Sequence, residues 1–422
     1  MFNQGVNQLF LRVVIFVLVS TLLGACSNFS ALKQDLTQLK ESSIQMNGEI
    51  ISKLDNDSPV ILVLFKDRDG SHIISARVFE SPGNFSFTTV DQSQYVFAFQ
   101  DKNRDSIFQE TELYGWFNNA NPITPVNHAS LNVSIELLPY SDNLIPAPPA
   151  FSYLMAEDFL GTTNIEVALG DIIQFDSPMF SSKQAEKGLW QPLSFIKDGT
   201  TGIHFQTPYD ENKIPVLFVH GINGSPTNFK FLSDNLNRDK YQFWFFNYPS
   251  GLRLNMLGSG LKTFLTALRH QYGFEEMHLV AHSMGGLVSR SYLNQCKVNQ
   301  SCKYVKSFIT ISTPWSGHLS AHTGVKYAPE VVPVWRDMSP ESKFLEKLFL
   351  SPLPNEVPHH LLFSYKGNGG IDKENNDGGV TLSSQLRMEA QQQSLETIGF
   401  NESHMSILSS TEVLEYLSKT LN

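Results

Sequence analysis

The chain has 422 residues, of which 41% are hydrophobic and 17% charged, a composition typical of folded globular proteins. Its length exceeds that of one ordinary domain of about 100 to 200 residues, so we expect two domains. Asp and Glu outnumber Lys and Arg by 41 to 31, which gives a net charge of −10. A chain with this excess of negative charge has no general attraction for a phosphate backbone, so we exclude nucleic-acid binding.

The N-terminal segment has the features of an export signal. Arg12 precedes an uncharged, largely apolar run at 13–23, which is shorter than the roughly 20 residues that a membrane-spanning helix needs. The run ends in Leu-Gly-Ala-Cys at 23–26, which resembles the lipobox of bacterial lipoproteins. The resemblance implies that residues 1–25 are a signal peptide and that Cys26 carries a lipid anchor. Ser27 is not the Asp that marks inner-membrane retention, so the resemblance implies an outer-membrane lipoprotein.

The other two cysteines, Cys296 and Cys302, lie close together in a polar stretch between apolar segments. In the oxidising environment to which an export signal directs the chain, we expect them to form a disulfide, with two free thiols as the alternative. The loop that they close is short, so the bond is a local crosslink rather than a constraint on the whole fold.

Residues 26–46 are predicted to form a polar tether or short helix, and residues 47–138 a small β-sandwich-like domain. Runs rich in β-branched and aromatic residues, separated by turn residues, predict the strands of this domain. The strands are expected at 60–65, 72–79, 85–90, 95–99 and 131–138. A proline-rich stretch at 139–149 then ends the domain, and residues 139–209 form a linker and lead-in segment.

One loop of this domain partly matches a calcium site. Asp101, Asn103, Asp105 and Glu112 have the spacing of EF-hand ligands. Ser106 replaces the glycine of the sharp turn, however, and the preceding segment is predicted to be a strand rather than a helix. A calcium loop and a plain Asx-rich turn are both left open, and no metal ligand is assigned.

From residue 210 to residue 422 the pattern alternates between buried strands and amphipathic helices. Strands are expected at 214–219, 241–246, 277–281, 305–311 and 360–365, with helices at 257–272, 285–294 and 412–420. This alternation is typical of an α/β domain, a mostly parallel sheet with helices on both faces. The segment 315–358 is too long for a simple connection, so we expect either a lid or a capping helix that belongs to the core.

A serine lies between the strand at 277–281 and the helix at 285–294, within Ala281-His282-Ser283-Met284-Gly285. Small residues two positions before and after the serine permit a tight, strained turn that lifts its hydroxyl above the sheet. Ala281 replaces the first glycine of G-x-S-x-G, and its methyl group is still small enough. The pattern predicts Ser283 as a nucleophile.

The loop at His220-Gly221, the serine turn, Thr313-Pro314 and the segment 376–380 together resemble the α/β-hydrolase lipases and esterases of bacteria, over about residues 210–410. The resemblance implies an α/β-hydrolase fold and ester hydrolysis through an acyl-enzyme, without a metal or organic cofactor. It implies an oxyanion hole formed by the backbone N–H groups of Ile222 and Met284, and leaves His220 a structural role.

The order of the triad in this fold is Ser, Asp, His, so the acid and the base follow Ser283 in the chain. The predicted base is His404, which lies in a polar loop before the terminal helix, and the predicted acid is Asp377, whose neighbours Gly378 and Gly379 let the backbone curl. The competing histidines are His318, His322, His359 and His360, and the competing acids are Asp372 and Asp337.

The sequence therefore predicts a serine hydrolase of carboxylic esters, tethered to the outer membrane, with an ester or acyl-lipid substrate and unknown protein partners. A phospholipase, a thioesterase or another deacylase would use the same triad. A non-catalytic envelope binding protein, with the β-domain as its working part, is the alternative from another class. The complete set of Ser283, Asp377 and His404 counts against that alternative.

Overall fold

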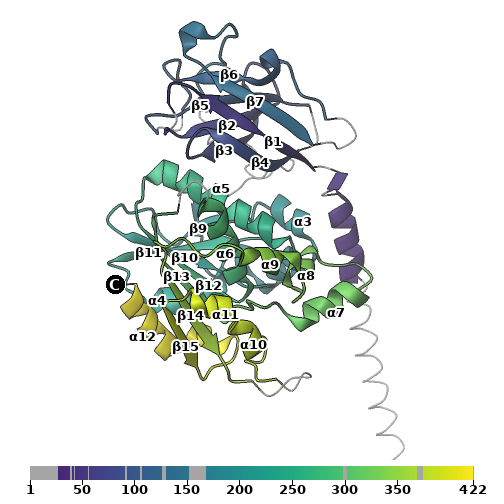
Figure 1. Ribbon diagram of the computed structural model, residues 1–422, viewed down its shortest axis with the longest axis vertical. Helices are drawn as coiled ribbons and strands as arrows, with labels where there is room; N and C mark the ends of the chain where they lie inside the picture. The colour runs from purple at the N-terminus through teal and green to yellow at the C-terminus, as the bar shows by residue number, and fades with distance from the viewer. Residues whose placement is uncertain are drawn as a thin grey trace, which may run out of the picture.

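The computed structural model describes residues 27–38, 40–41, 43–55, 57–90, 93–104, 107–125, 130–151, 168–297, 302–367 and 374–421 (Figure 1). The predicted signal peptide, Cys26, Asp105 and Asp372 lie outside these residues. Among the residues that are described, no helix has both the length and the apolar character needed to cross a bilayer. Two bodies of regular structure are visible, an all-β part and a larger α/β part.

The all-β part, called the β-domain below (residues 43–142), consists of two packed sheets. The first sheet has the order β4-β1-β7 and the second the order β3-β2-β5-β6. The bounds are β1 (Ser43–Ser52), β2 (Val60–Phe65), β3 (Ile73–Phe79), β4 (Gly83–Val90), β5 (Tyr95–Gln100), β6 (Tyr114–Trp116) and β7 (Leu131–Leu137), with short helices η1 (Phe117–Ala120) and η2 (Tyr140–Asp142). Apolar side chains from both sheets, such as Met46, Leu62 and Ile135, form the core between them.

The segment predicted as a tether is structured where it is described. Residues 27–38 are helical, and Leu32 of this helix is fully buried. The carboxylate of Asp35 accepts hydrogen bonds from the backbone N–H groups of Leu193 at 2.7 Å and Ser194 at 3.0 Å, at the start of α3 (Pro192–Lys197). A carboxylate at a helix N-terminus is stabilising, so the segment is fixed to the α/β part. Strand β1 begins at Ser43, within the predicted tether. Its start includes Met46, which is fully buried in the β-domain core.

The α/β part is built on an eight-stranded sheet of order β15-β14-β13-β12-β10-β11-β9-β8. Its strands pair in parallel except for β9 with β11. The bounds are β8 (Ala168–Ile172), β9 (Gly202–Phe205), β10 (Ile214–Val219), β11 (Tyr241–Asn247), β12 (Met277–His282), β13 (Val305–Ile311), β14 (His359–Ser364) and β15 (Glu396–Phe400). The sheet therefore starts before residue 210, since β8 and β9 lie in the predicted lead-in segment.

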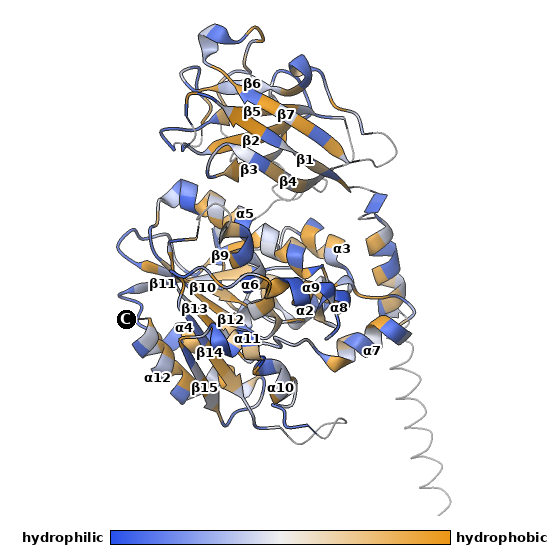
Figure 2. Ribbon diagram, in the orientation of Figure 1, coloured by the Kyte–Doolittle hydropathy of each residue, from blue (hydrophilic) through white to orange (hydrophobic). Residues whose placement is uncertain are grey.

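Helices cover both faces of this sheet, and successive strand residues supply the two cores. Leu217 and Leu279 face the core that includes α5 (Leu254–Tyr272) and α6 (Met284–Lys297). Val216 and Val280 face the opposite core with α4 (Lys230–Asn235) and α12 (Thr411–Thr420). The remaining helices are η4 (Pro178–Phe180), α2 (Ser182–Trp190), η5 (Pro226–Phe229), α7 (Leu319–Tyr327), α8 (Pro333–Met338), α9 (Lys343–Leu348), α10 (Leu382–Gln385), α11 (Met388–Gln392) and η6 (Ser406–Ser409). The strands are correspondingly rich in hydrophobic residues (Figure 2).

The insertion at 315–358 contains α7, α8 and α9, which differ in burial. Val334 of α8 and Leu345 of α9 are buried in the main core, so these helices are parts of the domain itself. Helix α7 buries Ala321 but leaves Leu319 half exposed and Tyr327 exposed. Helices α8 and α9 therefore correspond to the predicted capping helix that belongs to the core, and α7 is the exposed element of the insertion.

Two further sequence predictions are located by the fold. Cys296, near the end of α6, and Cys302 are joined by a disulfide. In the calcium-like loop, Asp101 Oδ2 lies 2.6 Å from His270 Nε2, and Glu112 Oε2 accepts a hydrogen bond from the Gln109 N–H at 3.1 Å. Within the described residues there is no group of three or more side chains that could hold a metal ion.

Candidate active site

Ser283 occupies a sharp turn between β12 and α6, and its φ of 53° lies in the left-handed region that is unfavourable for a residue with a side chain. The turn works only with small neighbours. A Cβ added to Gly285 would lie 2.2 Å from the carbonyl oxygen of Val219, and one added to Gly221 would lie 2.9 Å from the Ser283 Cβ. Gly285, one of the small residues in the sequence pattern, therefore lies where the backbone at the end of β10 approaches the turn too closely for a side chain.

The three residues predicted as a triad lie together at the carboxyl end of the sheet. His404 Nε2 is 2.9 Å from Ser283 Oγ, and His404 Nδ1 is 2.8 Å from Asp377 Oδ2. Ser283 follows β12, Asp377 lies in the loop after β14, and His404 follows β15, so parallel strands bring together three distant parts of the chain. With its proton on Nδ1, the imidazole donates to Asp377 and its Nε2 can accept the serine proton.

Asp377 is fully buried, and both of its oxygens accept hydrogen bonds. Oδ1 accepts from the N–H groups of Gly379 at 2.9 Å and Val380 at 2.6 Å, and Oδ2 accepts from Ser364 Oγ at 2.7 Å. Burial by itself raises the pKa of Asp377, but the hydrogen bond and charge of His404, with the bonds from Ser364 and Val380, outweigh it and lower the pKa. The carboxylate is therefore ionised beside the imidazole at neutral pH.

Sequence reasoning missed two residues that hold this acid. Gln385 donates from Nε2 to Asp377 Oδ2 at 3.2 Å and to the Val380 carbonyl at 3.2 Å, while its Oε1 accepts from the Ser364 N–H at 3.0 Å. Ser364 and Gln385 are both buried. No local pattern marks either residue, because their contacts arise only when the end of β14 and α10 meet in the fold.

A third missed residue is His282, directly before the nucleophile. Its Nε2 lies 2.8 Å from the backbone carbonyl oxygen of His404, and the two rings are 4.8 Å apart. Burial lowers the pKa of His282 to about 3, so this imidazole is neutral and its Nε2–H donates to the carbonyl. His282 is thus a positioning residue, which fixes the backbone of His404 to the turn that carries Ser283. Its place inside the serine motif was the available sequence signal.

The predicted oxyanion amides belong to Met284, the residue after Ser283, and to Ile222, the residue after Gly221, whose backbone approaches Ser283. Met284 is the first residue of the 14-residue helix α6, whose N-terminus favours negative charge, and Ile222 lies in the loop after β10. Neither amide donates a hydrogen bond to another group in the part of the chain that the structure describes. Gly224 N–H donates to the Gly221 carbonyl at 3.2 Å and Asn223 N–H to Ser250 Oγ at 3.0 Å, which shapes this loop.

His220 supports the same loop. Its Nδ1 lies 2.8 Å from the Gly221 carbonyl oxygen, its ring stacks on Tyr248 at 4.1 Å, and the Tyr248 hydroxyl donates to the His220 carbonyl. Burial lowers the pKa of His220 to about 4, so the ring is neutral. It is a packed residue beside the loop rather than a partner of Ser283.

The competing predictions are placed elsewhere. His318 Nε2 lies 2.5 Å from the Gly379 carbonyl, and its Nδ1 caps α7 by accepting from the Ser320 N–H. Asp337 forms an ion pair with Arg253. The other three histidines face hydroxyl groups, His322 that of Ser339, His359 that of Thr310 and His360 that of Tyr416. Among the described alternatives, none contacts Ser283.

An eight-stranded, mostly parallel sheet with a serine turn after β12, and with Ser283, His404 and Asp377 hydrogen-bonded in line at its carboxyl end, is an α/β-hydrolase fold. Residues 255–421, less than half of the chain, match the family described as "Alpha/beta hydrolase of unknown function (DUF915)". No curated protein sequence matches the chain.

Several solved structures are similar to about half of this chain or less. The mature Bacillus licheniformis lipase BlEst2 has 20% identity and a TM-score of 0.42, covering 52% of this chain and 98% of its own. The product of the lin2722 gene from Listeria innocua has 15% identity and a TM-score of 0.38, covering 50% and 94%. Lipase B from Aspergillus fumigatus has 16% identity and a TM-score of 0.31, covering 39% and 40%. A shared fold does not specify a substrate.

Proposed function

We propose that the protein is a serine hydrolase that cleaves carboxylic esters through an acyl-enzyme intermediate. The observation that carries this proposal is the continuous line of hydrogen bonds from Asp377 through His404 to Ser283, on a strained turn after a sheet strand. Nucleophile, base and orienting acid lie at distances at which proton transfer is direct.

In the proposed mechanism, His404 Nε2 takes the proton of Ser283 as Oγ attacks the ester carbonyl carbon. The negative charge that develops on the carbonyl oxygen is stabilised by the N–H groups of Ile222 and Met284, each contributing roughly 3 kcal/mol to the transition state. The imidazolium then protonates the leaving alcohol, which departs and leaves an acyl group on Ser283. Water attacks this ester with His404 again as the base, and the carboxylic acid is released.

Asp377 has an electrostatic role in both steps. It holds the imidazole with the proton on Nδ1 and stabilises the positive charge that His404 acquires, without taking the proton itself. Ser364, Gln385 and two backbone N–H groups donate hydrogen bonds that stabilise the carboxylate charge and fix its orientation before substrate arrives. This preorganisation is what the buried network contributes to the rate.

We further propose that the enzyme acts at the bacterial outer membrane, anchored by a lipid on Cys26, and that its substrate is an ester or acyl lipid. The lipobox-like tetrapeptide at 23–26 supports this location. Intact-mass spectrometry of the protein purified from membranes tests it, since a diacyl or triacyl modification of Cys26 is expected. Mature protein with an unmodified Cys26 would contradict the lipoprotein assignment.

The hydrolase proposal is tested with p-nitrophenyl esters of increasing acyl length, using the full chain in a non-ionic detergent beside Ser283→Ala. Turnover that is lost in the variant supports the proposal, and the preferred chain length distinguishes an esterase from a lipase. Acyl-thioester and phospholipid substrates assayed in parallel distinguish the deacylases that share this triad. A folded protein without Ser283-dependent hydrolysis of any of these acyl groups would contradict the proposal.

A further inference from the structure

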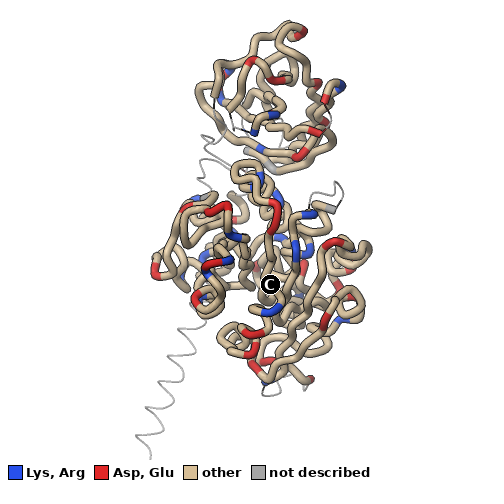
Figure 3. The backbone as a smooth tube through the Cα atoms, turned by 90° about the vertical axis from the view of Figure 1, so that its left-hand side faces the viewer, with Lys and Arg blue, Asp and Glu red and all other residues tan. Residues whose placement is uncertain are grey.

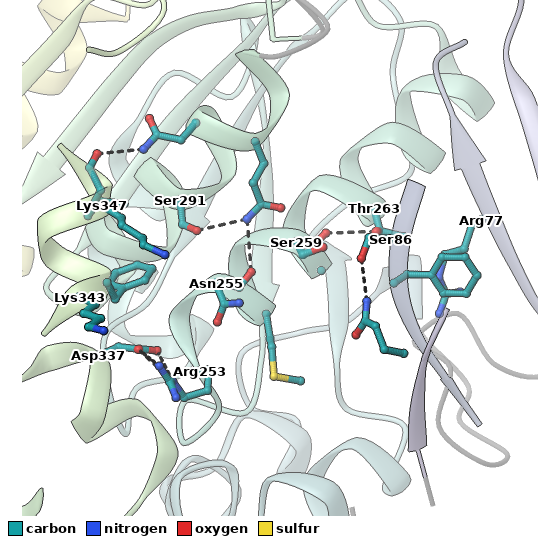
Figure 4. A pocket seen from close by; sticks show the side chains of 18 residues that line it. Arg77, Ser86, Arg253, Asn255, Ser259, Thr263, Ser291, Asp337, Lys343 and Lys347 are labelled. Atoms are coloured by element: carbon teal, nitrogen blue, oxygen red, sulfur yellow. Dashed lines mark hydrogen bonds and ion pairs between the residues drawn. The ribbon is translucent and has the colours of Figure 1, made fainter. Parts of the chain in front are cut away.

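A cavity of about 670 Å³ lies where the β-domain meets the α/β part, and no triad or oxyanion residue lines it. One wall comes from β1, β3 and β4, and the other from α5, α6 and the segment of α8 and α9 (Figure 4). The lining residues of α6 begin at Ser291, about 10 Å or more along the helix from Ser283. The volume is within the range of sites for small ligands.

Direct contacts hold the two walls together. Arg269 of α5 and Glu80 of the β-domain form an ion pair at 3.3 Å. His270, one residue on, lies 2.6 Å from Asp101, and both side chains are almost completely buried. Buried polar contacts of this kind fix an orientation, because breaking either partner leaves the other unsatisfied. The cavity is therefore a defined part of the fold.

The cavity has an excess of positive charge. Four cationic side chains line it, Arg77, Arg253, Lys343 and Lys347, against one carboxylate, that of Asp337. Asp337 is buried and already engaged, since Arg253 donates to both of its oxygens and the Leu254 N–H donates to Oδ2 at 2.7 Å. Lys343 and Lys347 therefore add positive charge that Asp337 does not balance, in a chain of net charge −10 along which acidic and basic residues are otherwise interspersed (Figure 3).

Lys343 and Lys347 lie one turn apart on α9, and both are exposed. Within the described part of the chain, neither has a carboxylate within 4 Å. Like charges four residues apart on a helix repel each other, so this pair costs stability unless an anion lies between them. In Figure 4 both lysines lie on the side of the cavity opposite Arg77 and Ser86.

Hydroxyl and amide groups of α5 lie between these cationic ends, and a further hydroxyl lies at the Arg77 end. Ser259 and Thr263 of α5 and Asn255 at the start of that helix line the middle of the cavity, and Ser86 of β4 lies on the Arg77 side (Figure 4). Such groups donate and accept hydrogen bonds, as the hydroxyl groups of a polyol do. Phe87 and Phe344 add apolar surface to the lining, against which the carbon face of a ring can pack.

We infer that this cavity binds a phosphorylated polyol, either a free sugar phosphate or the phosphoglycerol headgroup of a lipid. The phosphoryl group contacts Lys343 and Lys347, and the polyol hydroxyl groups bond to the α5 side chains. A phosphomonoester carries a charge of about −1.5 to −2 at pH 7, and the phosphodiester of a phosphoglycerol headgroup carries one negative charge. In both, the unesterified phosphoryl oxygens can accept charge-assisted hydrogen bonds from the two ammonium groups. The site is independent of ester hydrolysis, and it gives the β-domain a function as one wall of a binding site.

The test is isothermal titration calorimetry of the full chain in a non-ionic detergent at low salt. The probes are glucose 1-phosphate, glycerophosphoglycerol and, as the uncharged comparison, glucose. We expect saturable binding of at least one phosphorylated probe and none of glucose. In Lys343→Gln/Lys347→Gln the Kd should rise about tenfold, because two charge-assisted contacts are lost.

The matched control is Lys303→Gln/Lys419→Gln, which removes the same charge from two exposed lysines outside the cavity. It should bind as the unaltered chain does, and neither double variant should melt below the unaltered chain. Lys343→Gln/Lys347→Gln should melt slightly higher, because it removes the repulsion on α9. Binding of glucose 1-phosphate alone identifies a soluble ligand, and binding of glycerophosphoglycerol alone a lipid headgroup. The inference is wrong if neither phosphorylated probe binds, if glucose binds equally well, or if both double variants behave alike.

Discussion

The carboxyl end of the large sheet and the cavity beneath the β-domain are both polar, but they are stabilised in opposite ways. At the sheet, Asp377 is fully buried and each of its oxygens has several hydrogen-bond partners. In the cavity, Lys343 and Lys347 are exposed to solvent and have no carboxylate within 4 Å among the described residues. The proposed catalysis at the sheet therefore depends on the placement of individual atoms. The proposed ligand binding in the cavity depends on the number of positive charges, which water and salt screen.

The largest difference between the regions is expected from Ser283→Ala. Ester hydrolysis should fall by at least about 10⁴-fold, since the nucleophile is lost, while the free energy of unfolding changes by less than about 1 kcal/mol. Steady-state kinetics and chemical denaturation measure the two quantities. The cavity variant Lys343→Gln/Lys347→Gln should retain full hydrolysis, and an equal loss in both would mean that the regions are not independent.

The next largest effect is expected from Asp377→Asn, which retains the shape but not the charge of the acid. The amide favours the wrong imidazole tautomer and cannot stabilise the imidazolium, so kcat should fall by about 10⁴-fold with little change in KM. Gln385→Ala should reduce kcat much less, because Ser364 and two N–H groups still hold the carboxylate. Equal losses in the two variants would contradict the assignment of Asp377 as the acid.

The positioning role of His282 predicts an intermediate effect. His282→Phe removes the hydrogen bond to the His404 carbonyl and should lower kcat by about 10- to 100-fold, since small misplacements of a catalytic group are costly. His282→Gln places an amide N–H near the same position and should restore part of the rate. If both variants lose the same activity, or if kcat falls only in step with the melting temperature, His282 has a packing role alone.

Lowering the pH should destabilise the folded protein through the buried histidines of the α/β part. The cavity contributes nothing to this effect, because its lining contains no histidine. Burial lowers the pKa of His282 and His359 to about 3 and that of His220 to about 4, from the usual 6.5. Between pH 6.5 and about 4 the unfolded chain therefore binds protons that the folded chain does not. As the pH is lowered through this window, the free energy of unfolding should therefore decrease by about 1.4 kcal/mol per pH unit for each such proton.

Urea denaturation at several pH values from 7 to 4.5 measures this slope. Lys343→Gln/Lys347→Gln should show the same slope as the unaltered chain, since no imidazole is near those lysines in the cavity lining. A free energy of unfolding that is constant over the window would mean that these histidines are protonated in the folded state.

The smallest effect is expected in the cavity. Lys343→Glu converts the repulsive pair on α9 into an attractive Glu–Lys pair with the acid at the start of the helix, and it should raise the free energy of unfolding by a few tenths of a kcal/mol, about 0.3 to 0.8, at low salt. Thermal denaturation at low and high salt tests this, because screening should remove the gain. A variant that is less stable at low salt would show that the two lysines are held apart by contacts other than solvent.

Much of the site was predictable because the residues that make it carry local signals. Ser283 is flanked by residues small enough for its turn, and Gly378 and Gly379 follow Asp377 directly. Most of the predicted strands are present, since their apolar runs reflect burial on both faces. The start of the sheet was placed too late, because β8 and β9 are short strands whose assignment depends on pairing with distant β11.

By itself, the sequence determined the fold class and predicted Ser283 as the nucleophile, because backbone sterics and hydrophobic periodicity act over a few neighbouring residues. The sequence also named His404 and Asp377 as candidates, but only the tertiary structure brings them into contact with Ser283, since the loops after β14 and β15 meet it through strand order. Ser364, Gln385 and His282 enter the network for the same reason. The cationic cavity likewise exists only where the β-domain and α9 approach each other, and no segment of sequence encodes that juxtaposition alone.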